Sequence, residues 1–263
     1  MSRSISFDRA AEFYDRTRAL KPEVQESVTG ALAAELQRLD ARWLLEVGAG
    51  TGRITYPLTQ RGVRVTAIDI SLPMLLRFRE KPGAADGVDF LLGDATRLPF
   101  RTGSFRAALT VHVLHLIPDW QRAIQELQRV LAPGGVVMRL GDIDDFERLA
   151  EHRDSDTAWN GILARRGYVP RVRAGIQDTN AYVREIGGSV RTLEVAHDFD
   201  LRSERDWIGE LRRRIHSNLW EVPDEIYWPA VDEYEAWARQ RFPALDEPRR
   251  VNRIYILDVW TWG

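Results

Sequence analysis

Hydrophobic residues in the first half of the chain gather in short runs. The runs are bounded by turn-forming residues, and several are rich in β-branched side chains, which is typical of buried strands. They span Trp43 to Val47, Gly62 to Ile70, Val88 to Leu92, Phe105 to Val111 and Val136 to Leu140. The pattern therefore predicts five strands before residue 141.

Segments with helical periodicity lie between these runs. Apolar residues recur every three or four positions from Val24 to about Asp40 and again from Asp119 to Leu131, as amphipathic helices require. Two further helices are expected, one from Arg53 to Arg61 and one directly after Ile70, with Ser71 as its N-cap. Strands that alternate with helices predict a parallel sheet built from right-handed crossovers and covered by helices.

The pattern changes after Gly141, where helix-like, arginine-rich segments contain most of the tryptophans. Val190 to Ala196 and Ile254 to Trp260 alternate like strands, and we expect them to extend the sheet at one edge, with a helical insertion of about residues 200–248 between them. The predicted fold class is α/β, a Rossmann-like, doubly wound, mostly parallel sheet with an antiparallel edge strand. Residues 1–141 form its core, and residues 142–263 complete the sheet and carry the insertion.

Composition narrows the kind of protein. The 263 residues are 44% hydrophobic, which is enough to fill a core, and the net charge of −2 gives no overall field that attracts nucleic acid or an anionic membrane. The absence of cysteine excludes disulfides, thiolate catalysis and thiolate-bound metal. The first residues lack a signal-peptide pattern, and the best apolar run, Ala107 to Pro118, is far shorter than the roughly 20 residues of a membrane span. We therefore expect a cytoplasmic protein.

A glycine-rich turn, GAGTG at Gly48 to Gly52, joins the first predicted strand to the helix after it. Dinucleotide-binding folds use G-x-G-x-x-G, but this chain has Arg53 at the position of the third glycine. Glu46 precedes the first glycine by two residues, and an acidic side chain there suits a cationic ligand group better than a diphosphate. The turn argues against a nicotinamide dinucleotide, while a purely structural glycine turn stays open.

Two aspartates end neighbouring predicted strands. Asp69 ends the second strand about 20 residues after the glycine turn, where a carboxylate can accept hydrogen bonds from both hydroxyls of a ribose. Asp94 ends the third strand, and each aspartate alone could be a cap or a turn residue. The ends of parallel strands converge on one crevice, however, so Glu46, Asp69 and Asp94 together favour a nucleoside pocket.

Five segments, in order and with matching spacing, resemble the class I S-adenosylmethionine-dependent methyltransferases. The likeness is to the small-molecule branch that includes the quinone-biosynthesis enzymes (methyltransferase type 11), and it covers roughly Phe7 to Gly141. The segments are LEVGAGTG (Leu45 to Gly52), AIDIS (Ala67 to Ser71), GDATRLPF (Gly93 to Phe100), LTVHVLHLI (Leu109 to Ile117) and ELQRVLAPGG (Glu126 to Gly135). The resemblance implies that residues 1–141 bind S-adenosylmethionine, that a small molecule accepts the methyl group, and that the insertion covers the substrate.

The resemblance also implies cofactor contacts. The glycine turn would lie against the methionine and ribose parts, two carboxylates would hold the ribose diol and the adenine amino group, and apolar residues would pack on the adenine. Phe7 to Leu20 resembles a helix that closes over the cofactor, and Tyr14 and Arg18 in it would then contact the cofactor carboxylate. The alternative is an ordinary surface helix. The cofactor-binding set is Tyr14, Arg18, Glu46, Gly48, Ala49, Gly50, Asp69, Ile70, Met74, Asp94, Ala95 and Val111.

Catalysis needs a proton acceptor only if the methyl acceptor must lose a proton. His112 and His115, three residues apart after the fourth strand, are the candidate bases, although each could instead be a packed or capping histidine. We also hypothesise an apolar cavity between Tyr14, these histidines and the insertion around Trp207 to Trp228, the alternative being that its tryptophans fill a core. The histidines show no metal-ligand spacing.

The remaining features exclude some functions and leave others open. Enzymes that methylate exocyclic amino groups of nucleic-acid bases resemble one another in an Asn/Asp-Pro-Pro-Tyr segment after the fourth strand. This chain has VHVLH at that place, which argues against methylation of nucleic-acid bases. The arginines at 165–166 and 212–214 have acidic neighbours and are read as solvated helix faces rather than an RNA contact. A nicotinamide-dependent oxidoreductase and a non-catalytic cofactor-binding module are the alternative functions, and the sequence does not indicate an oligomeric state.

Overall fold

The computed structural model describes residues 6–8, 11–144, 150–169 and 174–263. The chain divides into two compact units. The first contains residues 1–142, 173–196 and 255–263, and the second contains residues 143–172 and 197–254. Within the described residues, no helix is both long enough and apolar enough to cross a membrane.

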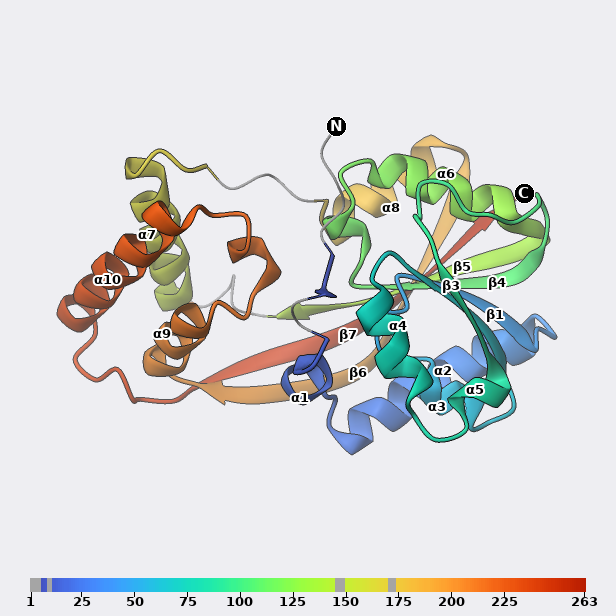
Figure 1. Ribbon diagram of the computed structural model, residues 1–263, viewed down its shortest axis with the longest axis horizontal. Helices are drawn as coiled ribbons and strands as arrows, with labels where there is room; N and C mark the ends of the chain where they lie inside the picture. The colour runs from blue at the N-terminus through green and yellow to red at the C-terminus, as the bar shows by residue number, and fades with distance from the viewer. Residues whose placement is uncertain (1–5, 9–10, 145–149, 170–173) are drawn as a thin grey trace. The chain divides into compact units, whose positions relative to one another are not determined.

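A seven-stranded sheet organises the fold in the order β3-β2-β1-β4-β5-β7-β6 (Figure 1). Its strands are β1 (Trp43–Val47), β2 (Arg64–Asp69), β3 (Val88–Leu92), β4 (Phe105–Val111), β5 (Leu131–Asp144), β6 (Gly188–Arg202) and β7 (Arg249–Trp262). The five strands from β1 to β5 pair in parallel, and β7 runs antiparallel beside β5. The predicted mostly parallel sheet, extended at one edge by the last two strands, is confirmed.

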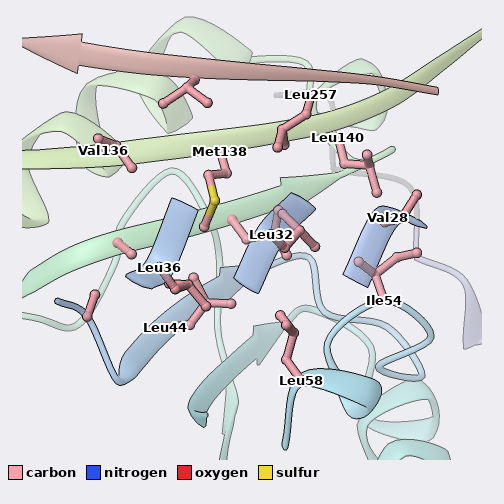
Figure 2. Packing of buried hydrophobic residues seen from close by; sticks show 14 of the residues in the cluster. Val28, Leu32, Leu36, Leu44, Ile54, Leu58, Val136, Met138, Leu140 and Leu257 are labelled. Carbon is pink, nitrogen blue, oxygen red and sulfur yellow. The ribbon is translucent and has the colours of Figure 1, made fainter. Parts of the chain in front are cut away.

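Helices cover both faces of the sheet in the first unit, because neighbouring strand residues point to opposite sides. Leu44 packs on the face covered by α2 (Pro22–Arg38), together with Leu32 and Leu36 of that helix (Figure 2). Leu45, one residue later, packs on the face where α6 (Trp120–Val130) and α8 (Ile176–Glu185) contribute side chains such as Ile124. The helices of this unit are α1 (Tyr14–Arg18), α2 (Pro22–Arg38), α3 (Tyr56–Thr59), α4 (Leu72–Arg79), α5 (Ala84–Gly87), α6 (Trp120–Val130) and α8 (Ile176–Glu185), with a 3₁₀ turn at Leu114–Leu116.

Some element boundaries differ from the sequence-based expectation. The helix expected from Arg53 to Arg61 is reduced to the four residues of α3, because the chain after the glycine turn first forms tight turns. Phe7 to Leu20 resembles a closing helix in sequence, but among its described residues only the five of α1 are α-helical. Strand β5 starts at Leu131 rather than Val136, since Leu131 already pairs with Phe105 across a register shift.

A buried polar cluster connects β5, β7 and α8 within the first unit. Asp258 is fully buried and accepts hydrogen bonds from Arg139, from Asn180 at 3.0 Å and from Thr192 at 2.5 Å. The Nε of Arg139 donates at 3.1 Å, and its Nη2 makes a second, shorter bond to the same oxygen. Trp260 in turn donates to the side-chain oxygen of Asn180 at 2.8 Å. The charge of Asp258 is therefore compensated by one arginine and two neutral donors.

The second unit has its own core. It contains α7 (Ala150–Arg165), α9 (Glu204–Arg213), α10 (Asp224–Arg241) and a 3₁₀ turn at Ser217–Leu219. Trp159 contacts Tyr227 and Tyr234 edge to face, with ring centroids 5.9 and 5.8 Å away. Trp207 and Trp237 pack against this core, whereas Trp228 is 41% exposed. Most of the tryptophans in this unit thus pack in or against its core. The apolar cavity between Tyr14, the two histidines and the insertion stays a prediction.

The arginine pairs of the second unit meet acidic partners. Arg165 and Arg166 each lie 2.8 Å from a carboxylate oxygen of Glu233. Arg212 bridges Asp232 and Glu235 at 2.7 and 2.8 Å. These ion-paired guanidinium groups agree with the interpretation of solvated helix faces. Arg214 does not: it is buried and donates hydrogen bonds to the carbonyl oxygen of Leu219 at 2.9 Å and to Asp224 at 2.6 Å.

Candidate functional site

A cavity opens at the carboxyl ends of the parallel strands where the strand order reverses between β1 and β4, the usual ligand position in such sheets. It encloses about 70 Å³. Phe7, Val113, Leu116 and Ile117 also line it, although they are not in the cofactor-binding set predicted from the sequence. The predicted site residues that the structure brings together here are Tyr14, Gly48, Gly50, Asp69, Ile70, Met74, Asp94, Ala95, Val111 and His112.

The glycine turn forms one wall of the cavity because of its backbone conformation. Gly48 and Gly50 have φ angles of +75° and +56°, which L-amino acids with side chains rarely adopt. A Cβ on Gly48 would lie 2.5 Å from a methyl carbon of Val113, and one on Gly50 would lie 3.2 Å from Cε of Met74. Both glycines are thus required for the turn itself and for the space in front of it.

Asp69 is held at the edge of the cavity by two backbone amides. Its Oδ2 accepts a hydrogen bond from the N–H of Gly50 at 2.8 Å, and its Oδ1 accepts one from the N–H of Ser71 at 2.8 Å. Burial raises the pKa of Asp69, and the amide hydrogen bonds act in the opposite direction. The carboxylate is fixed between the end of β2 and the glycine turn, where the sequence predicted a ribose contact.

Glu46, Arg18 and Ala49 do not line the cavity, although the sequence analysis placed them in the cofactor-binding set. Glu46 is only 2% exposed, and Thr55 donates a hydrogen bond to its carboxyl group behind the glycine turn. Burial raises the pKa of Glu46 to about 8. At neutral pH this side chain is therefore largely uncharged, and the structure does not present it to a cationic ligand group.

This burial predicts a pH-dependent stability. Glu46 ionises at about 4.5 in an unfolded chain and at about 8 in the folded protein, so the folded state binds the extra proton between these values. The free energy of unfolding should then fall by up to ~1.4 kcal/mol for each pH unit from pH 5 to 8. Urea unfolding of Glu46→Gln should show a shallower decline over this range than the wild type. The exposed Glu80→Gln variant is the control, and parallel curves for wild type and Glu46→Gln would contradict the prediction.

The amino-terminal segment is tied to the glycine turn and to α4. Asp15 of α1 accepts a hydrogen bond from Thr51 and forms an ion pair with Lys81 at 2.9 Å. Asp8 accepts hydrogen bonds from the hydroxyls of Ser6 at 2.6 Å and Ser71 at 2.5 Å, and these two bonds lower the pKa of Asp8. These contacts hold Phe7 and Tyr14 over the cavity. The contacts of Asp15 with Thr51 and Lys81 and of Asp8 with Ser71 could not be predicted from the sequence, because each joins single polar residues that are 36 or more positions apart.

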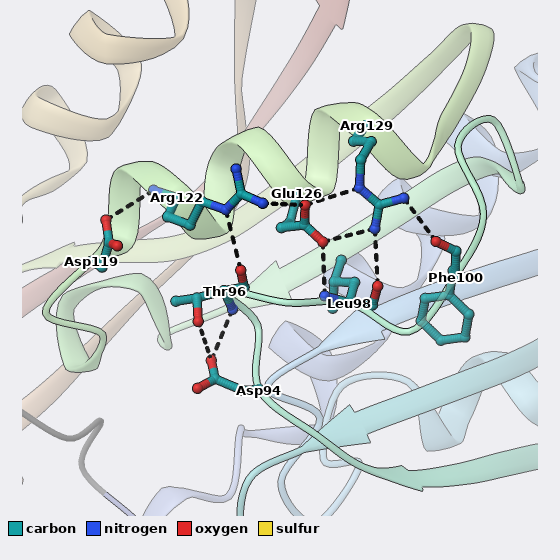
Figure 3. A network of polar contacts seen from close by, with 8 residues as sticks. All are labelled: Asp94, Thr96, Leu98, Phe100, Asp119, Arg122, Glu126 and Arg129. Carbon is teal, nitrogen blue, oxygen red and sulfur yellow. Dashed lines mark hydrogen bonds and ion pairs between the residues drawn. The ribbon is translucent and has the colours of Figure 1, made fainter.

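A carboxylate on α6 fixes the loop that follows β3 (Figure 3). Glu126 is 3% exposed; it accepts a hydrogen bond from the N–H of Leu98 at 2.8 Å and is paired with Arg129. Arg129 donates to the carbonyl oxygens of Leu98 and Phe100. The ion pair lowers the pKa of Glu126. The network thereby sets the position of Asp94, whose Oδ1 caps the start of the same loop by accepting bonds from Thr96.

The two candidate histidines follow β4. His112 has a left-handed backbone (φ +48°), a strained conformation that often marks functional residues, and its Nε2 lies 2.9 Å from Oδ1 of Asp142 at the end of β5. His115 does not line the first cavity, but both histidines line a second cavity of about 220 Å³. Asp142 carried no sequence signal, since its role depends on β5 lying beside β4. Among the described residues, no cluster of three or more histidines and carboxylates could hold a metal ion.

Comparison with known proteins agrees with this geometry. Residues 45–138 match the methyltransferase domain family. The chain is 33% identical over 208 residues to malonyl-[acyl-carrier protein] O-methyltransferase of Serratia marcescens, covering 78% of this chain and 76% of that protein. It is 32% identical over 183 residues to demethylmenaquinone methyltransferase of Thermobifida fusca, covering 68% and 75%. Three further relatives are matched over only 40%, 45% and 51% of their own length.

A solved structure from Thermotoga maritima, described as a SAM-dependent methyltransferase and possible histamine N-methyltransferase, has the same fold. It is 17% identical with a TM-score of 0.52, and the match covers 98% of both chains. The sheet has a glycine turn and two carboxylates, Asp69 and Asp94, at its switch point, on an α/β fold shared with methyltransferases. The chain belongs to the family of S-adenosylmethionine-dependent methyltransferases, and S-adenosylmethionine is the methyl donor of that family.

Proposed function

We propose that the cavity at the ends of β1, β2 and β4 binds S-adenosylmethionine and that the methyl group passes to a small molecule by in-line displacement. The observation that carries this proposal is the carboxylate of Asp69, fixed by two amides beside a left-handed glycine turn at the switch point of the sheet. Bound there, the cofactor supplies a methyl group already activated on a sulfonium. The protein then has to align it with the acceptor, which can lower the barrier by roughly 7–11 kcal/mol.

The lining residues fit the parts of this cofactor. Asp69 would accept hydrogen bonds from the ribose hydroxyls, while Ile70 and Met74 would pack on the adenine. Asp94 uses Oδ1 for Thr96, and its Oδ2 would accept from the adenine amino group, with the backbone of Ala95 beside the ring. The glycine turn and Val111 would face the ribose and the methionine part, since no Cβ fills the space in front of Gly48 and Gly50.

Binding requires a movement of the amino-terminal segment. Ligand cavities for molecules of this size measure about 300 Å³ or more, and the first cavity encloses about 70 Å³. Phe7 and Tyr14 contact each other edge to face, with ring centroids 5.7 Å apart, and both line the cavity. We infer that these two rings move outward when the cofactor enters and then cover it.

The test is direct binding followed by methyl transfer. Titration calorimetry should show micromolar binding of S-adenosylmethionine and no comparable binding of NADH, which separates the proposal from a nicotinamide-dependent oxidoreductase. Incubation with methyl-labelled cofactor and a metabolite extract should then yield a labelled small molecule. Tight cofactor binding without any labelled product would favour the non-catalytic binding module instead.

A further inference from the structure

The second cavity shares His112 and Val113 with the first, so the two cavities adjoin at these residues. It lies at the carboxyl ends of β4 and β5, and Gly175, Ile176 and Thr179 at the start of α8 also line it. Its volume is about 220 Å³. A cavity of about 150 Å³ can hold benzene, so this one has room for a single substituted ring.

His112 lines both cavities and lies beside a carboxylate of β5. Thr110 pairs with Arg139 and Val111 with Leu140, so His112, directly after β4, lies close to Asp142, near the end of β5. The carboxylate of Asp142 lies 2.9 Å from Nε2, which favours the proton of the neutral imidazole on Nε2 and leaves a lone pair on Nδ1. Across the described part of the chain, Nδ1 forms no hydrogen bond.

Arg139 offers a donor in the same cavity. Its Nε and Nη2 are used by Asp258, whereas Nη1 makes no hydrogen bond to any described residue. A Cβ on Gly141 would lie 3.0 Å from this Nη1, so the glycine leaves the space beside it open. The buried hydroxyl of Thr110, on the strand next to Arg139, also has no partner among the described residues. The cavity therefore combines the basic nitrogen of His112 with two donors that have no partner among the described residues.

We propose that the second cavity holds the methyl acceptor, and that this acceptor is a hydroxy compound about the size of one substituted ring that also carries a carbonyl or carboxylate oxygen. The inference rests on the proposed function and adds the class of substrate to it. The hydroxyl lies against Nδ1 of His112, and the carbonyl or carboxylate oxygen lies against Nη1 of Arg139. Asp142 is a positioning residue, because it acts through the orientation and tautomer of His112.

The transfer step balances with these groups alone. The hydroxyl oxygen forms a bond to the methyl carbon, the carbon–sulfur bond breaks with its electron pair left on sulfur, and the hydroxyl proton passes to Nδ1. The imidazolium beside Asp142 then loses its proton to water. Other charged or titratable groups face His112 across the two cavities: Tyr14, Asp69 and Asp94 line the first, and His115 and Arg139 line the second.

The first experiment observes the tautomer without any acceptor. In the full-length protein labelled with ¹⁵N-histidine, NMR should show neutral His112 with its proton on Nε2, and Asp142→Asn should lose or mix this tautomer while the backbone spectrum stays folded. A proton found on Nδ1 in the wild type would overturn the assignment of His112 as base. An Asp142→Asn spectrum with an unchanged tautomer would overturn the role of Asp142.

The second experiment measures transfer of labelled methyl to 2-, 3- and 4-hydroxybenzoate, with benzoate as the matched compound without a hydroxyl. We expect a methyl ether from at least one hydroxybenzoate. A general base contributes roughly 100-fold or more to the rate, so His112→Asn should lower kcat by about that factor and flatten the acid limb of the pH–rate profile. Gly141→Ala should raise the acceptor KM without changing cofactor affinity, and exposed His197→Asn is the control expected to keep wild-type kcat.

The outcomes separate this inference from the proposed function. If the wild-type protein does not bind the cofactor, the proposed function itself is wrong. If the cofactor binds, three outcomes would each overturn the inference and leave the methyltransferase assignment intact. These are methyl esters formed on the carboxylates, no transfer to any hydroxybenzoate, and an unchanged kcat in His112→Asn.

Discussion

Replacing Asp69 by asparagine is expected to weaken S-adenosylmethionine binding by at least tenfold. The carboxylate stands between the amides of Gly50 and Ser71, and its free lone pairs are the acceptors proposed for the ribose hydroxyls. A hydrogen bond to a charged group contributes about 1.5–3 kcal/mol, so loss of one such bond corresponds to roughly a 10- to 100-fold change in affinity. Calorimetry at constant ionic strength measures the change directly.

The control for this prediction is Asp89→Asn. Asp89 lies on the neighbouring strand β3 and forms an exposed ion pair with Arg64 at 3.0 Å, far from any proposed ligand contact. Its replacement should leave the affinity within about twofold, since exposed ion pairs contribute little. Equal affinity of wild type and Asp69→Asn would mean that the ribose is held elsewhere.

The second large effect concerns stability. Asp258→Ala should lower the free energy of unfolding by about 3–5 kcal/mol, because Arg139 would remain as a buried charge without its partner. Urea unfolding of wild type and variant checks this value. The surface variant Asp89→Ala should cost less than about 1 kcal/mol.

A double replacement separates loss of charge compensation from loss of packing. Arg139→Met combined with Asp258→Ala removes both buried charges and should recover part of the stability lost in Asp258→Ala. If the free energy of unfolding of the double variant is lower than that of Asp258→Ala, the uncompensated charge of Arg139 is not the cause of the stability lost in Asp258→Ala.

The strands could be predicted because each corresponds to a short, mostly apolar run in the sequence. β1, β3 and β4 have the predicted bounds, because each is a short run of mostly apolar residues that ends at turn-forming residues. Asp69 and Asp94 could be placed at the cavity for the same reason: parallel strands end on one side. The helix from Arg53 could not be bounded, because the tight turns after Gly52 depend on packing that periodicity does not show.

The roles of some site residues could not be predicted, because these roles depend on contacts between segments that are distant in the sequence. Asp8, Asp15 and Thr51 acquire their roles only when the amino-terminal segment meets the glycine turn. Asp142 becomes relevant only because β5 lies beside β4. In the opposite case, Glu46 has the residue type and spacing of a ligand contact, but the turn of the backbone directs its side chain into the protein interior.

The position of β7 has a consequence for how the sheet is assembled. β7 is the last strand in sequence, yet it lies between β5 and β6. Until it is made, β5 and β6 have no common neighbour and both keep a row of unpaired amide and carbonyl groups, a template for wrong pairing between chains. Completion of this sheet is therefore a late, long-range event, and chains shortened within residues 255–263 should aggregate rather than lose a peripheral strand.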